Sequence, residues 1–287
     1  MTLHKIRSYQ EEVLEPLFAL AKRNPDFSTE FMGLVDHGLA NYPLFCVSVA
    51  GRTFADKKDV LISAGVHGEE PAGVYTVLRF LEFLENDIFG FLGDFRFLIF
   101  PCVNPFGFEH GYRFNSQPDP EHGERGMDIN RWFKARTRCY EAANLMRILS
   151  RLARRFAFTV DLHETDPDWA SEGFTADDNP HTFYMWETAF DKSIRIGDKV
   201  VKEVGKITPL CDWDKIYKDT NHGGIIWYPE GCSNPVYALG TTLDGFLSAN
   251  YTPQSFTLET PCGWDMEKRV ATHLVALRKI LELKRNA

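Results

Sequence analysis

Residues 66–73, VHGEEPAG, place one histidine and two glutamates directly after an apolar run, DVLISAGV. Histidine nitrogens and carboxylate oxygens are common ligands of a catalytic zinc ion. A second histidine, His163, ends the apolar run FAFTVDL, and Glu259 lies near the end of SFTLET. Catalytic groups of α/β proteins gather at the carboxyl ends of strands. We therefore expect two imidazoles and two carboxylates to converge on one cleft.

The two glutamates of this stretch are not equivalent. A strand is expected to end at Val66 and a helix to begin by Pro71, so His67 and Glu70 lie three residues apart across one tight turn. Both can then face one ion, whereas Glu69 tends to point away. In the alternative interpretation, the glutamates only complement the positive end of the helix dipole. With a further imidazole at another strand end, we predict Glu70 as the metal ligand.

Apolar runs and helical periodicity define the elements that must position these residues. The strands are expected at 43–51, 59–66, 95–105, 156–164 and 255–261, the first two joined by a turn. The helices are expected at 5–23, 71–86, 138–154, about 187–204 and 265–285. Apolar strands that alternate with helices indicate an α/β sheet covered on both faces. Two long irregular regions, about 104–136 and the stretch up to 250, are expected to be functional.

Length and composition limit the class of protein. The 287 residues show no repeat, low-complexity tract or flexible linker, so we predict one domain over residues 1–287, with residues 1–40 as an extension packed on it. The net charge of −8 argues against nucleic acid as a partner, and no run is long enough to span a membrane. The six cysteines form no CxxC pair. Without an apparent signal peptide, we expect a cytoplasmic chain with reduced thiols.

Five motifs in order carry a family resemblance. They are HGEE, NPFGFEHGYRFN, GMDINRWF, DLHE and SFTLET, spread over residues 59–262. The chain thus resembles the zinc carboxypeptidase family, the carboxypeptidase A-like M14 group, which is related to the succinylglutamate desuccinylase and aspartoacylase branch. The resemblance implies a three-layer α/β/α fold with a mixed, mostly parallel sheet. It also implies one Zn²⁺ per chain, a peptide or acyl-amino-acid substrate, and a cytoplasmic, bacterial-type member without a propeptide.

The resemblance also implies roles for particular residues. The implied zinc ligands are His67, Glu70 and His163, with Glu259 as the general base that activates water and Arg113 as the group that stabilises the oxyanion. The implied substrate-binding residues are Asn130 and Arg131 for the terminal carboxylate, the mobile Tyr237, and Leu243 at the floor of the terminal-residue pocket. Asp128 would orient His67, and Asp161 is a further support candidate for His163.

The sequence departs from the digestive enzymes after His163. The segment ETDPDWASEGF replaces their short turn, and its residues Glu164–Asp168 add negative charge near the expected site. Those acids either favour cationic substrate groups or form a solvated loop. An apolar residue at Leu243 favours an uncharged terminal residue.

The leading functional hypothesis is a zinc metallocarboxypeptidase that hydrolyses a C-terminal peptide bond. The alternatives are a zinc amidohydrolase acting on a small N-acyl amino acid, or a murein-peptide amidase. DLHE resembles the acylase branch more, whereas SFTLET and the tyrosine context favour the peptidase. A non-enzymatic carboxylate-binding protein is the hypothesis of another class, and the intact Glu259 argues against it. The preferred substrate and the oligomeric state stay undetermined at this level.

Overall fold

The computed structural model describes residues 4–38, 40–51, 56–120, 126–170, 173–230 and 240–285. Most of its strands belong to one sheet, whose eight strands lie in the order β1-β2-β4-β3-β5-β10-β6-β9. The strands are β1 (Phe27–Asp36), β2 (Asn41–Val49), β3 (Lys58–Ala64), β4 (Phe95–Phe100), β5 (Phe158–Thr165), β6 (Tyr184–Ala189), β7 (Lys215–Ile216), β8 (Asp219–Thr220), β9 (Ile225–Tyr228) and β10 (Gln254–Pro261). The short strands β7 and β8 form a separate hairpin.

The sheet is mixed and mostly parallel, as predicted. Of its seven neighbouring pairs, β4–β3, β3–β5, β5–β10 and β6–β9 are parallel. The strand β5 is buried along its whole length and lies in the centre between β3 and β10. Such uninterrupted burial is typical of parallel strands covered on both faces.

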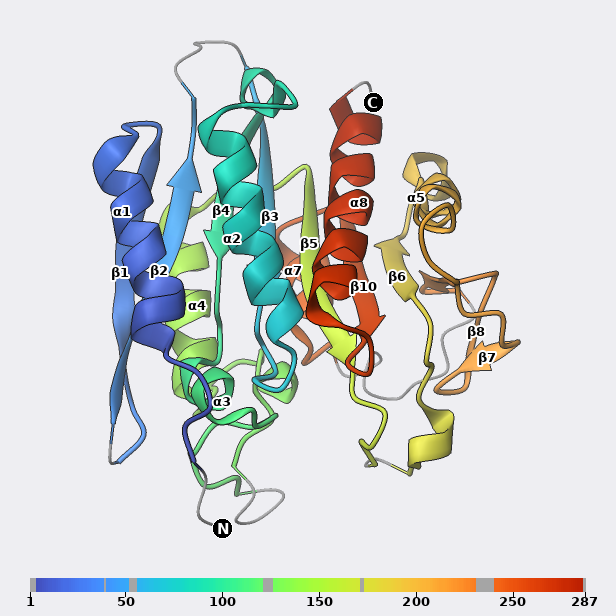
Figure 1. Ribbon diagram of the computed structural model, residues 1–287, viewed down its shortest axis with the longest axis horizontal. Coiled ribbons are helices and arrows are strands. Elements are labelled where there is room, and N and C mark those ends of the chain that lie inside the picture. Colours follow the sequence, from blue (N-terminus) through green and yellow to red (C-terminus); the bar gives the residue numbers. More distant parts are fainter. Residues whose placement is uncertain are drawn as a thin grey trace.

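Helices cover the sheet on both faces. They are α1 (Glu15–Arg23), α2 (Pro71–Glu85), α3 (Pro105–His110), α4 (Tyr140–Leu152), α5 (Gly197–Val204), α7 (Leu243–Asn250) and α8 (Met266–Arg285). Figure 1 shows α1, α2 and α8 in front of the sheet and α4 and α7 behind it. This arrangement confirms the predicted three-layer α/β/α architecture, and the hydrophobic core fills both interfaces between helices and sheet.

Three elements differ from the sequence-based expectation. The predicted helix at about 187–204 is two elements, because β6 ends at Ala189 and α5 begins only at Gly197. The segment TFYMWETAF alternates too little to indicate a strand, since both of its faces are buried. The N-terminal extension is partly built into the sheet, because Phe27–Asp36 forms the edge strand β1 and pairs antiparallel with β2. The consecutive strands β2 and β3 are separated by β4.

The topology brings the ends of several strands to one edge. Because β3, β5 and β10 run parallel, the residues that follow or end them lie side by side. In the β5–β10 register, Glu259 is the neighbour of His163. The fold therefore places the predicted chemical groups together before any side-chain contact is considered.

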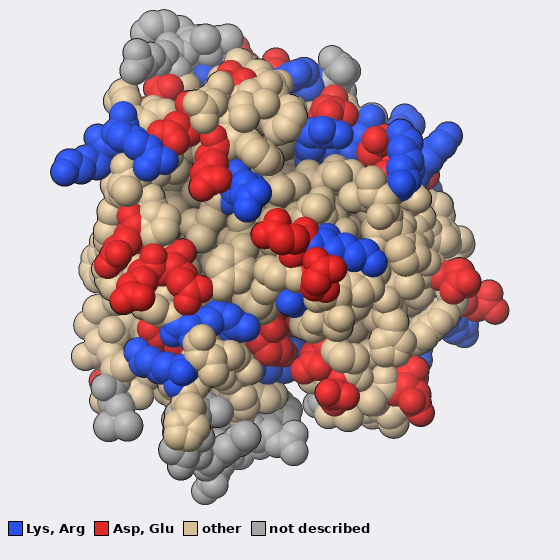
Figure 2. All heavy atoms as spheres, in the orientation of Figure 1, with Lys and Arg blue, Asp and Glu red and all other residues tan. Residues whose placement is uncertain are grey.

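The surface carries no single-sign stripe on the face seen in Figure 2, where acidic and basic side chains are interspersed. In the described part of the chain, no helix has the length and apolar character needed to cross a membrane.

Candidate metal centre

The turn between β3 and α2 presents His67 and Glu70 to the edge of the sheet. The chain leaves β3 through Gly65, whose φ of +64° favours glycine, and enters α2 at Pro71, where a missing N–H costs nothing. Gly68 packs against the first turn of α3 so tightly that a Cβ there would lie 1.9 Å from the carbonyl carbon of Gly107. The turn is therefore held in place by backbone packing.

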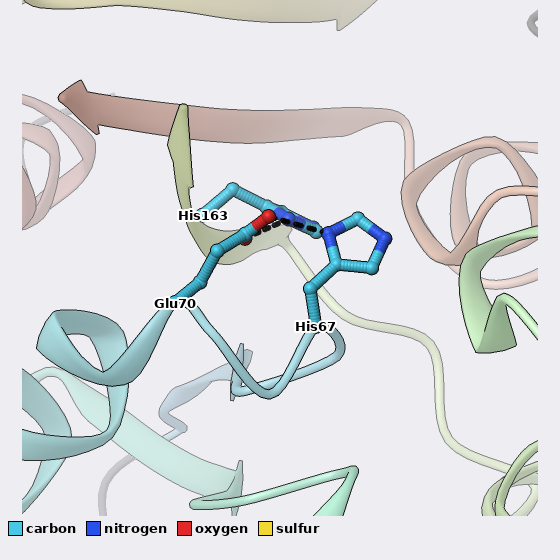
Figure 3. A group of neighbouring side chains, drawn as sticks. All are labelled: His67, Glu70 and His163. Carbon is cyan, nitrogen blue, oxygen red and sulfur yellow. Dashed lines mark hydrogen bonds and ion pairs between the residues drawn. The ribbon is translucent and has the colours of Figure 1, made fainter. Parts of the chain in front are cut away.

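His67, Glu70 and His163 form a compact, buried group (Figure 3). Glu70 Oε1 lies 2.6 Å from His67 Nδ1, and Glu70 Oε2 lies 2.8 Å from His163 Nδ1. One ligand atom from each residue lies within 4.8 Å of the others. The sequence-based choice of Glu70 over Glu69 thus agrees with the geometry, although the ligand role itself stays a prediction.

A further carboxylate contacts the second ring nitrogen, Nε2, of each of the two imidazoles. His67 Nε2 lies 3.1 Å from Asp128 Oδ1, and His163 Nε2 lies 2.9 Å from Asp161 Oδ2. Each Nε2–H can donate to its carboxylate, which leaves the Nδ1 lone pair directed at the anionic Glu70. The lone pairs of the two Nδ1 atoms and the negative charge of Glu70 then point at one another and repel, unless a cation lies between them. The donor set therefore fits a metal ion such as zinc.

The charges of this cluster shift the pKa values in the metal-free protein. Burial alone would raise the pKa of Glu70, but His67 and His163 lower it well below its usual range. Burial alone would lower the pKa of His163, but Asp161 and Glu70 raise it well above its usual range. Protons on the two imidazoles then take the place of the cation, so metal binding is expected to release protons.

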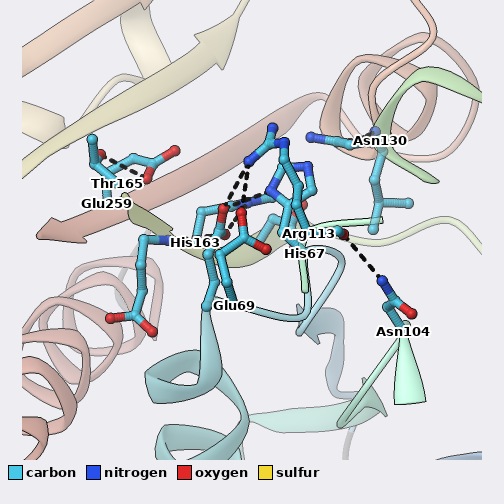
Figure 4. A network of polar contacts seen from close by, with 12 residues as sticks. His67, Glu69, Asn104, Arg113, Asn130, His163, Thr165 and Glu259 are labelled. Carbon is cyan, nitrogen blue, oxygen red and sulfur yellow. Dashed lines mark hydrogen bonds and ion pairs between the residues drawn. The ribbon is translucent and has the colours of Figure 1, made fainter. Parts of the chain in front are cut away.

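Arg113 lies at the centre of the network drawn in Figure 4. Its guanidinium contacts Asp128 at 3.3 Å, Glu70 at 3.3 Å and Glu69 at 3.2 Å, and these carboxylates raise the pKa of Arg113 against the effect of burial. Glu69 is partly buried, and its desolvation raises its pKa to about 7. Glu69 thus contacts Arg113, a partner that the sequence did not indicate.

Glu259 lies in the same pocket as the metal group. Thr165 Oγ1 donates to Glu259 Oε2 at 3.3 Å, and burial raises the pKa of Glu259 to about 8 against the lowering effect of His163. A carboxyl group with a pKa near neutrality can both accept and return a proton. The position of Glu259, in the same pocket as the metal group, thus suits the predicted general base.

Asn130 and Arg131 also line the pocket, as the predicted carboxylate anchors should. They belong to a single 3₁₀ turn that Asp128 caps by accepting from the Asn130 amide.

Leu243 does not form the predicted floor of the pocket. It is fully buried in the hydrophobic core, and its backbone N–H donates to Asn130 Oδ1. Its neighbour Asp244 lines the pocket instead, because the helix α7 turns successive side chains to different faces. Tyr237 lies outside the described residues.

The predicted acidic loop is divided by the structure. Glu164 is still part of β5 and is buried, with Arg269 Nη1 at 2.8 Å and the Ala72 amide at the start of α2 at 2.6 Å from its oxygens. Its charge is thus matched within the protein. Asp166 lines the pocket, whereas Asp168 is exposed. A cationic substrate preference therefore has less support than the sequence suggested.

The pocket is lined by the predicted metal-binding, catalytic and substrate-binding residues of the described ranges except Leu243, and the two support candidates Asp128 and Asp161 lie outside its lining. Its remaining walls include a group of aromatic residues that no sequence motif indicated, namely Trp169, Phe174, Tyr184, Trp186 and Tyr217. The signal available in the sequence was the density of aromatic residues in the second long irregular region.

Known proteins share this fold. A candidate metallopeptidase from Shewanella amazonensis SB2B matches with a TM-score of 0.72, 20% identity and 98% coverage of both chains. A metallo-carboxypeptidase from Burkholderia cenocepacia matches at 0.62 and 18% identity over 95% of this chain and 68% of that one. Carboxypeptidase A from Helicoverpa armigera matches at 0.66 and 15% identity over 100% of this chain and 74% of that one. These similarities establish the carboxypeptidase A-like fold.

The fold and site together define a metal-dependent hydrolase of the M14 type. Residues 56–199, half of the chain, match the family model described as the succinylglutamate desuccinylase/aspartoacylase catalytic domain. The chain belongs to this family.

Human carboxypeptidase B2 is a relative in sequence. It is 24% identical over 156 residues, which are 50% of this chain and 34% of the relative. The matched region thus spans about a third of carboxypeptidase B2. The family match includes the metal group and Arg131 but ends before Glu259.

Proposed function

We propose that this protein is a zinc-dependent metallocarboxypeptidase that hydrolyses the C-terminal peptide bond of a peptide. One observation carries the proposal: the group His67, Glu70 and His163 shares a single pocket with Glu259 and Arg131. Hydrolysis next to a free carboxylate needs a metal site, a proton carrier and an anion anchor, and the pocket holds candidates for all three.

Zinc bound at this site would act as a Lewis acid toward the carbonyl and lower the pKa of water. Glu259, which lines the same pocket as the metal group, takes a proton from the attacking water and returns it to the leaving amine. Arg113 supplies hydrogen-bond donors where negative charge develops on the carbonyl oxygen. Its contacts with Glu69 and Asp128 hold the guanidinium at the metal group.

The substrate carboxylate binds at Arg131 and Asn130 in this proposal. A guanidinium offers two parallel N–H donors that match the geometry of a carboxylate. The hydrogen bond from the Leu243 amide to Asn130 Oδ1 fixes the Asn130 side chain, so its amide group is oriented before substrate arrives.

A second candidate function is hydrolysis of a small N-acyl amino acid. The family match at residues 56–199 favours it, because that family model is named for a desuccinylase and an acylase. Both reactions need the same carboxylate anchor and differ only in the acyl side of the substrate. They are therefore separable by substrate and not by the metal site.

The experiment measures zinc content and then turnover of two substrate sets. Blocked dipeptides with different C-terminal residues represent the first function, and N-acetylaspartate and N-succinylglutamate represent the second. The proposal expects about one zinc per chain, cleavage of a blocked dipeptide, and loss of that cleavage in Glu259→Gln. Turnover of only the N-acyl amino acids would establish the second function instead. Absence of bound zinc would overturn both.

The anchor is tested with a matched pair of arginine variants. Arg131→Met removes a pocket arginine, whereas Arg138→Met removes an exposed arginine seven residues away. We expect Arg131→Met to raise KM at least tenfold for substrates with a free carboxylate and to have little effect on the corresponding amide. Arg138→Met should leave both unchanged. A KM that rises equally for acid and amide would exclude a carboxylate anchor at Arg131.

A further inference from the structure

The pocket has an aromatic wall, which the proposed reaction does not use. We define it as Trp169, Phe174, Tyr184, Trp186 and Tyr217. Its residues come from the segment after β5, from β6 and from the β7–β8 hairpin. This part of the chain holds one of the two long irregular regions that the sequence marked as functional.

The rings of the aromatic wall support one another. The Tyr217 ring packs edge-on against Trp169 at 6.2 Å and against Phe174 at 5.1 Å between centroids, and Tyr184 packs edge-on against Trp186 at 5.1 Å. Edge-to-face pairs of this kind fix ring orientation. Trp169 and Tyr217 are only partly buried. The wall therefore offers apolar surface to the pocket in a fixed arrangement.

Polar contacts anchor the outer part of the wall. Tyr217 Oη donates to Asn179 Oδ1 at 2.8 Å, and Asn179 Nδ2 donates to the carbonyls of Trp169 and Pro167 at 2.8 and 3.2 Å. Asn179 is fully buried. One buried amide thus joins the segment after β5 to the β7–β8 hairpin and sets the distance between Trp169 and Tyr217.

The hairpin adopts a backbone conformation that is costly for its residues. Tyr217 has a φ of +49° and Lys218 a φ of +74°, both in the left-handed region. Two-residue hairpin turns of this kind favour Asn and Gly at both positions. Strained backbone of this kind occurs preferentially at functional sites. The position of the Tyr217 ring is therefore imposed by the surrounding contacts and not by the turn.

The aromatic wall lies beside the groups that act on the scissile bond. Tyr184 Oη is 2.9 Å from Thr165 Oγ1, which donates to Glu259, and the Arg113 guanidinium lies 4.9 Å from the centre of the Trp169 ring. In Figure 4, Glu259 and Thr165 lie on one side of the two ligand histidines and Asn130 on the other. Tyr184 and Trp169 of the wall thus lie next to Thr165 and Arg113, which border the groups assigned to the scissile bond.

We propose that the aromatic wall is the binding site for the acyl side of the substrate and that it selects amides whose acyl group carries an aromatic ring. This inference rests on the proposed function, because it takes the carboxylate anchor and the metal group as fixed points. A phenyl ring buries apolar area against the wall, and an edge-to-face contact with Tyr217 adds to the attraction. An acetyl group buries less apolar area there than a phenyl ring, and a succinyl carboxylate would lose hydration.

Binding without turnover tests the inference directly. Zinc-loaded Glu259→Gln protein is titrated calorimetrically with the N-phenylacetyl and N-acetyl derivatives of the same amino acid, for leucine, arginine and glutamate in turn. We expect the phenylacetyl derivative of at least one amino acid to bind at least tenfold more tightly than its acetyl counterpart. Equal affinities for all three pairs, or no binding of any compound, would overturn the inference.

A pair of turn variants assigns the preference to the wall. Tyr217→Asn removes the ring and suits a positive φ. Lys218→Asn relieves the same backbone strain at the adjacent exposed position, and it removes an ammonium 5.1 Å from the Phe174 ring but no ring of the wall. In the Glu259→Gln background, Tyr217→Asn should lower the affinity ratio of phenylacetyl to acetyl at least fivefold, and Lys218→Asn should retain it. An unchanged ratio in Tyr217→Asn would contradict the assignment.

The two proposals fail in different ways. If the otherwise unmodified protein hydrolyses neither the blocked dipeptides nor these N-acyl amino acids while the binding ratio and its loss in Tyr217→Asn hold, the proposed function is wrong and the binding site stands. If the protein cleaves acetyl and phenylacetyl derivatives with equal kcat/KM and binds them equally, the function stands and the aromatic selectivity is wrong.

Discussion

Asp161 and His163 are two residues apart on the buried strand β5, and Asp161 Oδ2 lies 2.9 Å from His163 Nε2. Alternate residues of a strand point to the same face, so the strand itself aligns the pair. Ser63 on the adjacent strand β3 donates to the other oxygen of Asp161 at 2.7 Å. The imidazole is therefore held by two strands of the sheet, with its Nδ1 directed at Glu70.

This relationship predicts the effect of Asp161→Asn. The amide cannot stabilise the orientation of His163 as the carboxylate does, so zinc affinity should fall about 10–100-fold. Competition with a chelating dye measures the affinity. Asp168→Asn, in the exposed segment after β5, is the matched control and should leave zinc affinity unchanged. Equal affinities of Asp161→Asn and the unmodified protein would show that Asp161 is not a support of the metal site.

The two adjacent glutamates give the second prediction. Glu70→Gln removes a carboxylate that faces both Nδ1 atoms, so zinc should be lost on purification, with a fall in affinity larger than that of Asp161→Asn. Glu69→Gln loses only a contact with Arg113, so the protein should keep about one zinc per chain and lose activity through Arg113. Elemental analysis and turnover of the best substrate measure the two effects. Retention of zinc by Glu70→Gln would contradict the ligand assignment.

The sequence was sufficient for the groups that follow a central strand. His67, Glu70 and His163 sit at the ends of apolar runs, and the common direction of β3 and β5 brings such ends together. Asp161 was within reach of the same argument, because strand alternation depends on sequence spacing alone.

Contacts between distant segments were not predictable in this way. The partner of Glu69 is Arg113, 44 residues away, and that of Glu164 is Arg269, 105 residues away. The placement of Leu243 failed for a related reason, since the face that α7 turns to the core is decided by tertiary packing. The strand β6 was not predicted, because both of its faces are buried and its sequence therefore shows no alternation of polar and apolar residues.

Gly68→Ala tests how the metal-binding turn is held. A Cβ at Gly68 would meet the backbone of Gly107 at 1.9–2.4 Å, so one of the two segments must move. We expect a loss of about 1–3 kcal/mol in the free energy of unfolding, as in other overpacked sites, together with weaker zinc binding. Gly93→Ala is the control, because no heavy atom lies within 4 Å of its added Cβ. Urea unfolding with a chelator present, and zinc titration, separate the two effects.

The Gly68 prediction has a clear contrary result. If Gly68→Ala unfolds at the same urea concentration as Gly93→Ala and binds zinc normally, the turn can shift without cost. The backbone contact between Gly68 and Gly107 would then not position His67 and Glu70.

Glu259 gives a prediction about pH in the zinc-free protein. Burial raises its pKa from an ordinary 4.5 to about 8 in the folded state. Because the folded pKa exceeds the unfolded one, the stabilising contribution of the proton is complete below about 4.5 and is lost as pH rises toward 8. Glu259→Gln has no such proton. Its free energy of unfolding should therefore rise relative to the unmodified protein by up to about 1.4 kcal/mol per pH unit in that interval.

Urea titrations at pH 5.5, 6.5, 7.5 and 8.5, with a chelator present, measure this difference. Glutamine keeps an oxygen that can accept from Thr165, so the comparison isolates the charge. Glu267→Gln on the exposed face of α8 is the control and should run parallel to the unmodified protein. A difference between Glu259→Gln and the unmodified protein that stays constant with pH would mean that Glu259 is ionised throughout. Burial would then not set the proton affinity of Glu259, and its carboxylate would already be a base at neutral pH.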